Sequence, residues 1–373
     1  MALENLDELR AVSKKFCFDG ELIDAQLNSQ GHINDSYAVI IRNSSGKTCR
    51  YMLQRINHNV FKNPEKLMDN IKRVLTHIRK RILADGGDPM REVLTIIRTK
   101  DGGCYYKSPE GYYWRAYIYL EDATTYQIVE KPEHLYSAGM AFGKFQQQLS
   151  DFPACELYET IPDFHNTVKR FEKFEQVLKE DKLDRAKNAA DEVAFVLERK
   201  EDASRLINLR NAGELPLRVT HNDTKFNNVM IDIRTGKAMC VIDLDTVMPG
   251  LSLYDFGDAI RSGTNPASED EKDLTKVKMD LDLYEHFTRG FLEAGASFLT
   301  PNEIENMPFA AKLMTFEVGM RFLTDYLEGD VYFKTHREGH NLDRARTQLK
   351  MVRDMEMKME KMLEIVHKHF PER

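Results

Sequence analysis

One short segment constrains the fold of this chain more than any other feature of its sequence. Two apolar, strand-like runs at residues 215–220 and 229–233 enclose a polar loop, residues 221–228, whose sequence is HNDTKFNN. A third apolar run follows at residues 239–244, after a Thr-Gly turn. Runs of this kind, separated by turn residues, predict short β-strands within a region whose pattern is otherwise helical. The polar residues are therefore expected in a loop between strands.

The loop carries the residue types that phosphoryl transfer from a nucleotide requires. That reaction needs an acceptor for the proton of the attacking hydroxyl, oxygen ligands for Mg²⁺, and a cation beside the transferred phosphate. Asp223 precedes Asn228 by five residues, the spacing of a kinase catalytic loop, so Asp223 is the expected base. Asn228 and Asp243 offer the oxygens that a hard cation prefers, and Lys225 offers the charge beside the phosphate. The alternative is a polar loop whose side chains only cap turns.

The rest of the chain divides into a part rich in strands and a part rich in helices. Before residue 121, apolar runs separated by turns predict an antiparallel sheet, and Asn63-Pro64-Glu65 predicts the start of one helix of about four turns. From residue 131 onward the pattern is mainly helical, with further helices expected near 166–180, 186–209, 273–295 and 302–328. It ends in a long amphipathic helix at 342–369 whose methionines we interpret as core residues. We expect an α+β fold with a nucleotide-binding lobe at 1–121 and a catalytic and acceptor-binding lobe at 122–373.

Composition excludes several classes of function. The chain has 53 Lys and Arg against 60 Asp and Glu, a net charge of −7, so it lacks the basic surplus of a nucleic-acid-binding protein. No apolar run approaches the roughly 20 residues that span a bilayer, and the N-terminus lacks the apolar core of a secretory signal. The five cysteines are widely spaced, which indicates reduced thiols. We expect a cytoplasmic protein, and nothing indicates a protein partner.

Two motifs resemble those of a known family. HNDTKFNN and the later VIDLDTVMPGLSLYDFGDAIR resemble the catalytic loop and metal-binding strand of the aminoglycoside phosphotransferase and choline kinase-like family. GHINDSY, LQRINHNVFKNPE, IPDFHNT, MRFLTDYLEGDVYF and HNLDRARTQL are similar to the N-acetylhexosamine 1-kinase branch of that family. The resemblance implies a two-lobed, protein-kinase-like fold, ATP and Mg²⁺ as cofactors, and Asp255 and Asp258 as buried support for the loop. N-capping of a helix is an equally good local explanation for these two residues.

The resemblance also implies a nucleotide site. The turn containing Gly31, His32, Ile33 and Asn34 would cover the phosphates, although an ordinary hairpin turn has the same composition. The usual strand lysine is absent, so Arg55 is the candidate phosphate-binding cation. Its partner would be Glu65 or Asp69, for which a helix-dipole role is the alternative. The backbone of Glu121 and Ala123, at the expected hinge, would contact adenine.

For the acceptor, the resemblance implies contacts from His32, Asp35, Asp223, Arg321, Asp325 and Tyr332. It implies phosphorylation of the anomeric C1 hydroxyl of an N-acetylhexosamine, such as N-acetylglucosamine or N-acetylgalactosamine. The alternatives are another hydroxyl acceptor on the same fold, such as another sugar, choline, homoserine or an aminoglycoside, and a non-catalytic nucleotide-binding scaffold. The small acidic excess and the basic residues near Arg321 favour a neutral sugar.

Overall fold

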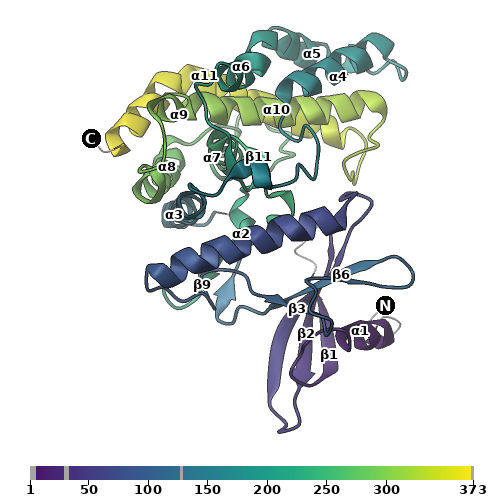
Figure 1. Ribbon diagram of the computed structural model, residues 1–373. Helices are drawn as coiled ribbons and strands as arrows, with labels where there is room; N and C mark the ends of the chain where they lie inside the picture. Colours follow the sequence, from purple (N-terminus) through teal and green to yellow (C-terminus); the bar gives the residue numbers. More distant parts are fainter. Residues whose placement is uncertain (1–5, 29–32, 127–128, 371–373) are drawn as a thin grey trace.

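The computed structural model describes residues 6–28, 33–126 and 129–370, which form two lobes (Figure 1). The smaller lobe is built on an antiparallel sheet of order β1-β2-β3-β6-β4, and β5 pairs with β6. Its strands are β1 (Glu21–Asn28), β2 (Asp35–Arg42), β3 (Thr48–Ile56), β4 (Ile96–Ile97), β5 (Tyr106–Lys107) and β6 (Tyr113–Ile118). The antiparallel N-terminal sheet expected from the sequence is therefore present.

Side chains of β3 and β6 alternate between the two faces of this sheet, as strand geometry requires. On one face, Leu53 and Trp114 are buried in a cluster with helix α1 (Leu6–Ser13). On the other face, Met52 and Tyr117 pack in the cluster that contains helix α2 (Pro64–Ala84). The α2 face is the one that meets the larger lobe (Figure 1).

Helix α2 begins where the sequence predicts. The side chain of Asn63 accepts a hydrogen bond from the backbone N–H of Lys66, and Pro64 occupies the first turn, where a missing N–H costs nothing. The helix is 21 residues long, more than the expected four turns. Leu67, Ile71 and other apolar residues at helical spacing continue to bury one face along this length, which explains the extension.

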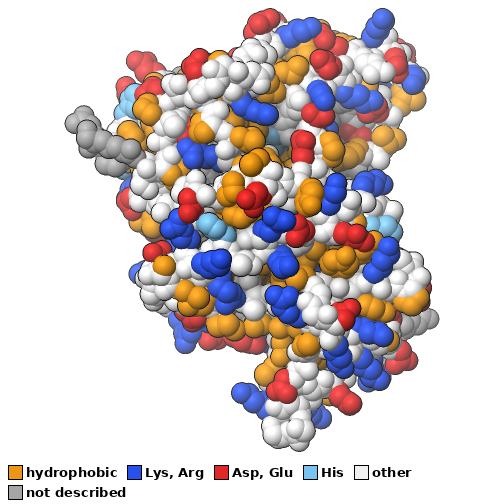
Figure 2. Space-filling model, viewed as in Figure 1, with side chains coloured by type: hydrophobic (Ala, Val, Ile, Leu, Met, Phe, Trp, Pro, Cys, Tyr) orange, Lys and Arg blue, Asp and Glu red, His pale blue; other side chains and the backbone are white. Residues whose placement is uncertain are grey.

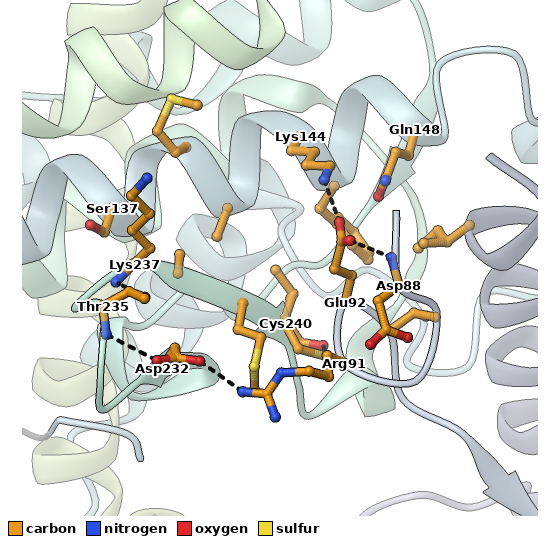
Figure 3. A pocket seen from close by; sticks show the side chains of 18 of the residues that line it. Asp88, Arg91, Glu92, Ser137, Lys144, Gln148, Asp232, Thr235, Lys237 and Cys240 are labelled. Carbon is orange, nitrogen blue, oxygen red and sulfur yellow. Dashed lines mark hydrogen bonds and ion pairs between the residues drawn. The ribbon is translucent and has the colours of Figure 1, made fainter. Parts of the chain in front are cut away.

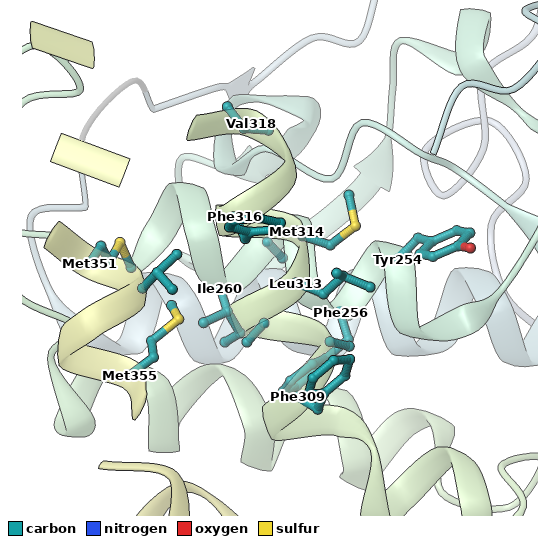
Figure 4. Packing of buried hydrophobic residues seen from close by; sticks show 14 of the residues in the cluster. Tyr254, Phe256, Ile260, Phe309, Leu313, Met314, Phe316, Val318, Met351 and Met355 are labelled. Carbon is teal, nitrogen blue, oxygen red and sulfur yellow. The ribbon is translucent and has the colours of Figure 1, made fainter. Parts of the chain in front are cut away.

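The larger lobe is mainly helical. Its helices are α3 (Pro132–Gln148), α4 (Thr167–Glu180), α5 (Ala190–Leu197), α6 (Arg205–Asn211), α7 (Ser252–Gly263), α8 (Leu281–Gly295), α9 (Pro301–Glu305), α10 (Met307–Glu328) and α11 (His340–His369). Residues of α7, α10 and α11 interdigitate in its core (Figure 4). Met351, Met355 and Met362 of α11 are fully buried there, as expected, whereas Met357 is exposed and Met359 is only partly buried.

Short strands interrupt the helical lobe close to the smaller lobe. β8 (Arg218–Thr220) pairs with β11 (Met248–Gly250), while β9 (Val229–Asp232) pairs with β10 (Ala238–Val241) and with β7 (Ala123–Thr124). The loop at residues 221–228 thus joins two small sheets. β7 follows directly on the boundary that we expect at residue 121.

Charged side chains of both signs lie on the surface of the molecule. Figure 2 shows basic and acidic side chains interspersed over one face of the molecule, in line with the small net charge. Among the described residues, no helix combines the length and the apolar character that crossing a bilayer requires.

Candidate active site

The loop between β8 and β9 brings three of the predicted residues into direct contact. The amide Nδ2 of Asn228 donates to Oδ2 of Asp223 at 3.1 Å and to the Asp223 carbonyl at 2.8 Å. Nζ of Lys225 lies 2.7 Å from Oδ1 of Asp223. Since the nitrogen of the Asn228 amide faces Asp223, its oxygen, the atom that can bind a cation, points to the other side.

Asp243 joins this group through the neighbouring strand. The N–H of Ile242 donates to the carbonyl of Asn228 at 2.9 Å, which extends the β9–β10 ladder by one residue pair and places Asp243 directly beyond it. Asp243 adopts the left-handed conformation, with φ of 58°, which few residues other than glycine adopt. Strained backbone of this kind is concentrated at functional sites.

The charges of the group show why a cation fits there. Burial raises the pKa of Asp243 to about 6, and repulsion by Asp245 and Asp223 acts in the same direction. Burial would also raise the pKa of Asp223, but the charge of Lys225 and its hydrogen bond outweigh it, so that the pKa of Asp223 lies below its ordinary value. Asp223 is therefore an ionised acceptor. The repulsion at Asp243 is what a divalent cation would relieve.

The donor set suits Mg²⁺ in particular. Within the described residues, three or more His, Cys, Asp or Glu side chains do not gather into a closed metal site. Mg²⁺ commonly takes one or two carboxylates and completes its shell with water and phosphate oxygens. Asn228 and Asp243 would hold it in this way.

Two buried carboxylates support the loop from helix α7. Asp255 accepts hydrogen bonds from the backbone N–H groups of His221 at 2.9 Å and Asn222 at 2.7 Å. Asp258 accepts from the N–H of Thr224 at 3.0 Å. The N-cap position of α7 is Leu251, which makes no side-chain capping bond. Of the two explanations for Asp255 and Asp258, the structure therefore supports loop support over N-capping.

Arg115 is the site residue that sequence reasoning missed. It is 2% exposed, and its Nη1 is hydrogen-bonded to Oδ1 of Asp245, two residues after Asp243. Oδ2 of the same carboxylate accepts from Nδ2 of Asn34 at 2.6 Å. The turn that carries Asp243 is thus attached to the smaller lobe by two donors.

The structure does not bring Arg55 to this cluster. Arg55 pairs with Trp114 across β3 and β6, so it lies on the α1 face, while the pair formed by Gln54 and Arg115 lies on the α2 face. Its guanidinium donates to Oδ2 of Asp35 at 2.6 Å. Asp35, expected at the acceptor, is thereby engaged on that side of the sheet as well.

The remaining nucleotide candidates are placed as follows. Oε1 of Glu65 accepts from the hydroxyl of Tyr113 at 3.3 Å, so the structure does not pair Glu65 with Arg55. The carboxylate of Glu121 accepts from Nε of Arg50 at 2.9 Å, and its carbonyl from Arg91 at 3.2 Å. Ala123 lies in β7, opposite Asp232.

In the turn expected to cover the phosphates, the carbonyl of Ile33 accepts a hydrogen bond from Nδ2 of Asn57 at 3.2 Å. Gly31 and His32 lie outside the described residues.

Among the residues expected at the acceptor site, Arg321 and Tyr332 lie close together, whereas the carboxylate of Asp325 is occupied by backbone hydrogen bonds. The Arg321 guanidinium lies 5.9 Å from the ring centroid of Tyr332 and 5.5 Å from that of Phe333. Asp325 is buried, and its oxygens accept from the backbone N–H groups of residues 331, 332 and 333 and from Asn341. Its carboxylate therefore shapes the turn that carries Tyr332, instead of offering free oxygens to an acceptor.

A separate cavity of about 530 Å³ lies between α2, α3 and the β9–β10 hairpin (Figure 3). Two ion pairs cross between the lobes at its rim, one from Arg91 to Asp232 at 2.8 Å and one from Lys144 to Glu92 at 2.7 Å. None of the predicted site residues that the structure describes lines this cavity. The candidate catalytic residues of the loop therefore lie outside this cavity.

Comparison with known proteins supports the fold. A model of the phosphotransferase enzyme family matches residues 24–278, more than half of the chain. A microcompartment-associated aminopropanol kinase has a TM-score of 0.66 at 12% identity, over 96% of this chain and 98% of its own. An amicoumacin kinase in complex with AMP-PNP and Ca²⁺ has a TM-score of 0.59 at 14% identity, over 96% and 94%. A choline kinase from Cryptosporidium parvum has a TM-score of 0.56 at 14% identity, over 93% of each chain. The expected kinase-like, two-lobed fold is confirmed.

Proposed function

The chain belongs to the phosphotransferase enzyme family, and from this premise we propose that it transfers the γ-phosphoryl group of ATP to the C1 hydroxyl of an N-acetylhexosamine. One observation carries the catalytic part of the proposal. The ionised carboxylate of Asp223 lies 2.7 Å from Nζ of Lys225 and accepts a hydrogen bond from the side-chain amide of Asn228. Asp243 lies just after the neighbouring strand β10, whose extension pairs with Asn228. A base, a cation and two oxygen ligands in one place are the parts that phosphoryl transfer requires.

The residues would share the reaction as follows. Asp223 accepts a hydrogen bond from the acceptor hydroxyl and takes its proton as the oxygen attacks the γ-phosphorus. The bond between that phosphorus and the β,γ-bridging oxygen breaks, and ADP leaves. Lys225 lies beside the transferred group and offsets its charge. Mg²⁺ held by Asn228 and Asp243 would screen the β- and γ-phosphates. Catalysis then consists mainly of positioning and electrostatic stabilisation.

The choice of acceptor rests on the sequence motifs and on the two residues expected at the acceptor site, Arg321 and Tyr332. Arg321 presents several N–H donors, which suit hydroxyl and amide carbonyl oxygens, and Tyr332 presents an aromatic face, which suits the carbon face of a sugar ring. An anomeric hydroxyl is more acidic than an ordinary alcohol, so a carboxylate is an adequate base for it. These features favour a neutral sugar over a cationic amine.

Product analysis by phosphorus NMR tests the proposal directly. The purified protein is incubated with MgATP and, in separate reactions, N-acetylglucosamine, N-acetylgalactosamine, choline and kanamycin. We expect a sugar 1-phosphate, which is distinguished from a 6-phosphate by its coupling to the anomeric proton, and no product with Asp223→Asn. Turnover of choline or kanamycin alone would refute the sugar assignment. Thermal stabilisation by nucleotide without turnover of any of these acceptors would instead favour a binding scaffold.

A further inference from the structure

The peptide unit that joins Asn222 to Asp223 is held at both ends by histidines. Its N–H, from Asp223, donates to Nδ1 of His221 at 3.2 Å. Its carbonyl, from Asn222, is 3.0 Å from Nε2 of His165, which lies just before helix α4. Asn222 itself has φ of 65°, in the left-handed region. The peptide unit that leads into Asp223, the proposed base, thus follows a residue in the left-handed conformation and is held by the side chains of His165 and His221.

The hydrogen-bond partners assign different protonation states to the two rings. Nδ1 of His221 accepts from an N–H, so its proton is on Nε2, which donates to the carbonyl of Ile242 at 2.8 Å. For His165 both neighbours are acceptors, because Nε2 faces the Asn222 carbonyl and Nδ1 lies 3.0 Å from Oε1 of Glu317. A neutral imidazole has only one N–H to donate, so opposite an ionised Glu317 the His165 ring satisfies both partners only as an imidazolium ion.

The surroundings of His165 can hold this charge. Glu317 of α10 is fully buried, and its Oε2 accepts from the hydroxyl of Thr167 at 2.6 Å. Burial alone would lower the pKa of His165, but the hydrogen bond and charge of Glu317, with Asp258 of α7, raise it above its ordinary value. Burial would raise the pKa of Glu317, but His165 and Arg321 of α10 lower it. The ring of Tyr254 on α7 lies 5.4 Å from the His165 ring, Arg170 of α4 lies near Glu317, and Asp255 of α7 binds the backbone N–H groups of His221 and Asn222.

We propose that His165 is a positioning residue for Asp223: as a buried imidazolium ion paired with Glu317, it donates to the Asn222 carbonyl and fixes the peptide unit on which the base stands. The inference rests on the proposed role of Asp223. It also links the catalytic loop to the expected acceptor site, since Glu317 lies one turn before Arg321 on helix α10.

The expected consequence of losing His165 is a misplaced base. A buried carbonyl without a donor seeks another partner, and rotation of this peptide unit would move the Cα of Asp223. Misplacement of a reacting group by about 1 Å costs up to roughly 100-fold in rate. The expected adenine contacts at Glu121 and Ala123, and the proposed Mg²⁺ ligand Asp243, lie outside this loop, so we expect a larger loss in kcat than in the apparent affinity for ATP.

Nitrogen NMR on the unaltered protein tests the charge independently of activity. The ¹⁵N resonances of the His165 ring are assigned by their absence from His165→Gln. We expect both nitrogens to be protonated at pH 8, where an ordinary histidine with a pKa near 6.5 is almost entirely neutral. A neutral ring at that pH overturns the proposal. This result does not depend on whether Asp223 is the base, which the Asp223→Asn assay decides separately.

Two variants then separate positioning from folding. In His165→Asn, the shorter amide can replace Nδ1 toward Glu317 but cannot reach Asn222, and we expect kcat to fall about 10- to 100-fold with the KM for ATP changed less than about 3-fold. In the double variant His165→Gln with Glu317→Gln, one amide donates to Asn222 and the other to the new Gln oxygen, so we expect most of the loss in kcat to be recovered. His286→Asn, at a partly exposed histidine of α8 whose Nδ1 contacts the carbonyl and carboxylate of Asp282, is the control. Unchanged kcat in His165→Asn, or a double variant as slow as the single one, refutes the positioning role.

Discussion

Replacing Arg115 by Met isolates the contact between the two lobes. The guanidinium and the carboxylate of Asp245 are 2% and 3% exposed, so the change leaves a buried carboxylate with the amide of Asn34 as its remaining partner. Removing one member of a buried ion pair costs about 3–5 kcal/mol. At about 2.1 cal/mol/K per residue, the entropy of unfolding of 373 residues is about 0.8 kcal/mol/K, so the melting temperature should fall by about 4–6 °C in a single cooperative transition.

Differential scanning calorimetry measures this shift, and two further variants test its cause. Removing both charges in Arg115→Met with Asp245→Leu should restore the melting temperature to within about 2 °C of the unaltered protein, because replacing a whole buried pair by apolar groups is often neutral. Arg55→Met on the neighbouring strand is the matched control, since its pair with Asp35 is partly exposed and worth at most about 1 kcal/mol. A melting temperature unchanged in Arg115→Met, or equal losses in the single and double variants, would refute the assignment of Arg115 as a buried anchor of the metal-binding turn.

Three further predictions follow from the site. Asp223→Asn should remove nearly all turnover while the dissociation constant for ATP, measured by calorimetric titration, changes little; near-normal turnover would refute its role as the base. Tyr332→Ala removes an aromatic ring that is 69% exposed, so the KM for the acceptor should rise several-fold with the KM for ATP unchanged, and equal changes in both would contradict an acceptor contact. The pair of His165 and Glu317 should make stability depend on pH. Because folding lowers the pKa of Glu317, its ionised form stabilises the folded state fully at pH values above about 4.5. Because folding raises the pKa of His165, its protonated form stabilises the folded state fully at pH values below about 6.5. The pair therefore contributes its full stability between about pH 4.5 and 6.5 and loses it on either side. Urea unfolding of the unaltered protein and of the double Gln variant at pH 3.5, 5.5 and 9 measures the difference, which should be largest at pH 5.5.

The residues that the sequence predicts correctly as neighbours are those whose relation is local. Asp223, Lys225 and Asn228 belong to one short loop, and Asp243 ends the next strand of the same hairpin, so spacing alone nearly determines their proximity. The start of α2 is predictable for the same reason, because Asn63 and the residues that it caps are adjacent in the chain.

The choice between Arg55 and Arg115 could not be made in this way. A shift of one residue in the alternation of a strand moves every side chain to the other face, and β3 offers no clear alternation, since Met52 and Leu53 are both apolar. Only the pairing of β3 with β6 places Gln54 and Arg115 on the α2 face. The signal that could have identified Arg115 is a lone cation within the otherwise apolar and aromatic run YYWRAYIYL.

Asp325 shows a second limit of the same kind. Its four hydrogen bonds come from a turn that reverses the chain after α10 and from Asn341 of α11, and the spacing along one helix cannot reveal such a return.

The bounds of two helices also differ from those expected from the sequence. The helix expected at 273–295 begins only at Leu281, because the Asp280 side chain accepts from the N–H groups of Asp282 and Leu283. The helix expected at 186–209 is divided into α5 and α6 by a 3₁₀ turn.

The turn that carries Asp243, the proposed Mg²⁺ ligand, is attached to the smaller lobe by contacts on both of its sides. Arg115 and Asn34 hold Asp245, and Nδ2 of Asn70 on α2 donates to the carbonyl of Val247 at 3.1 Å. Asp243 begins the same turn. The loop and helix α7 hold Asp223 within the larger lobe, and the hydrogen bond from Ile242 to Asn228 attaches Asp243 to the same loop, so contacts from both lobes fix the position of Asp243. A displacement of the sheet would therefore act through Arg115 on Asp245, two residues from the carboxylate that we propose as a Mg²⁺ ligand.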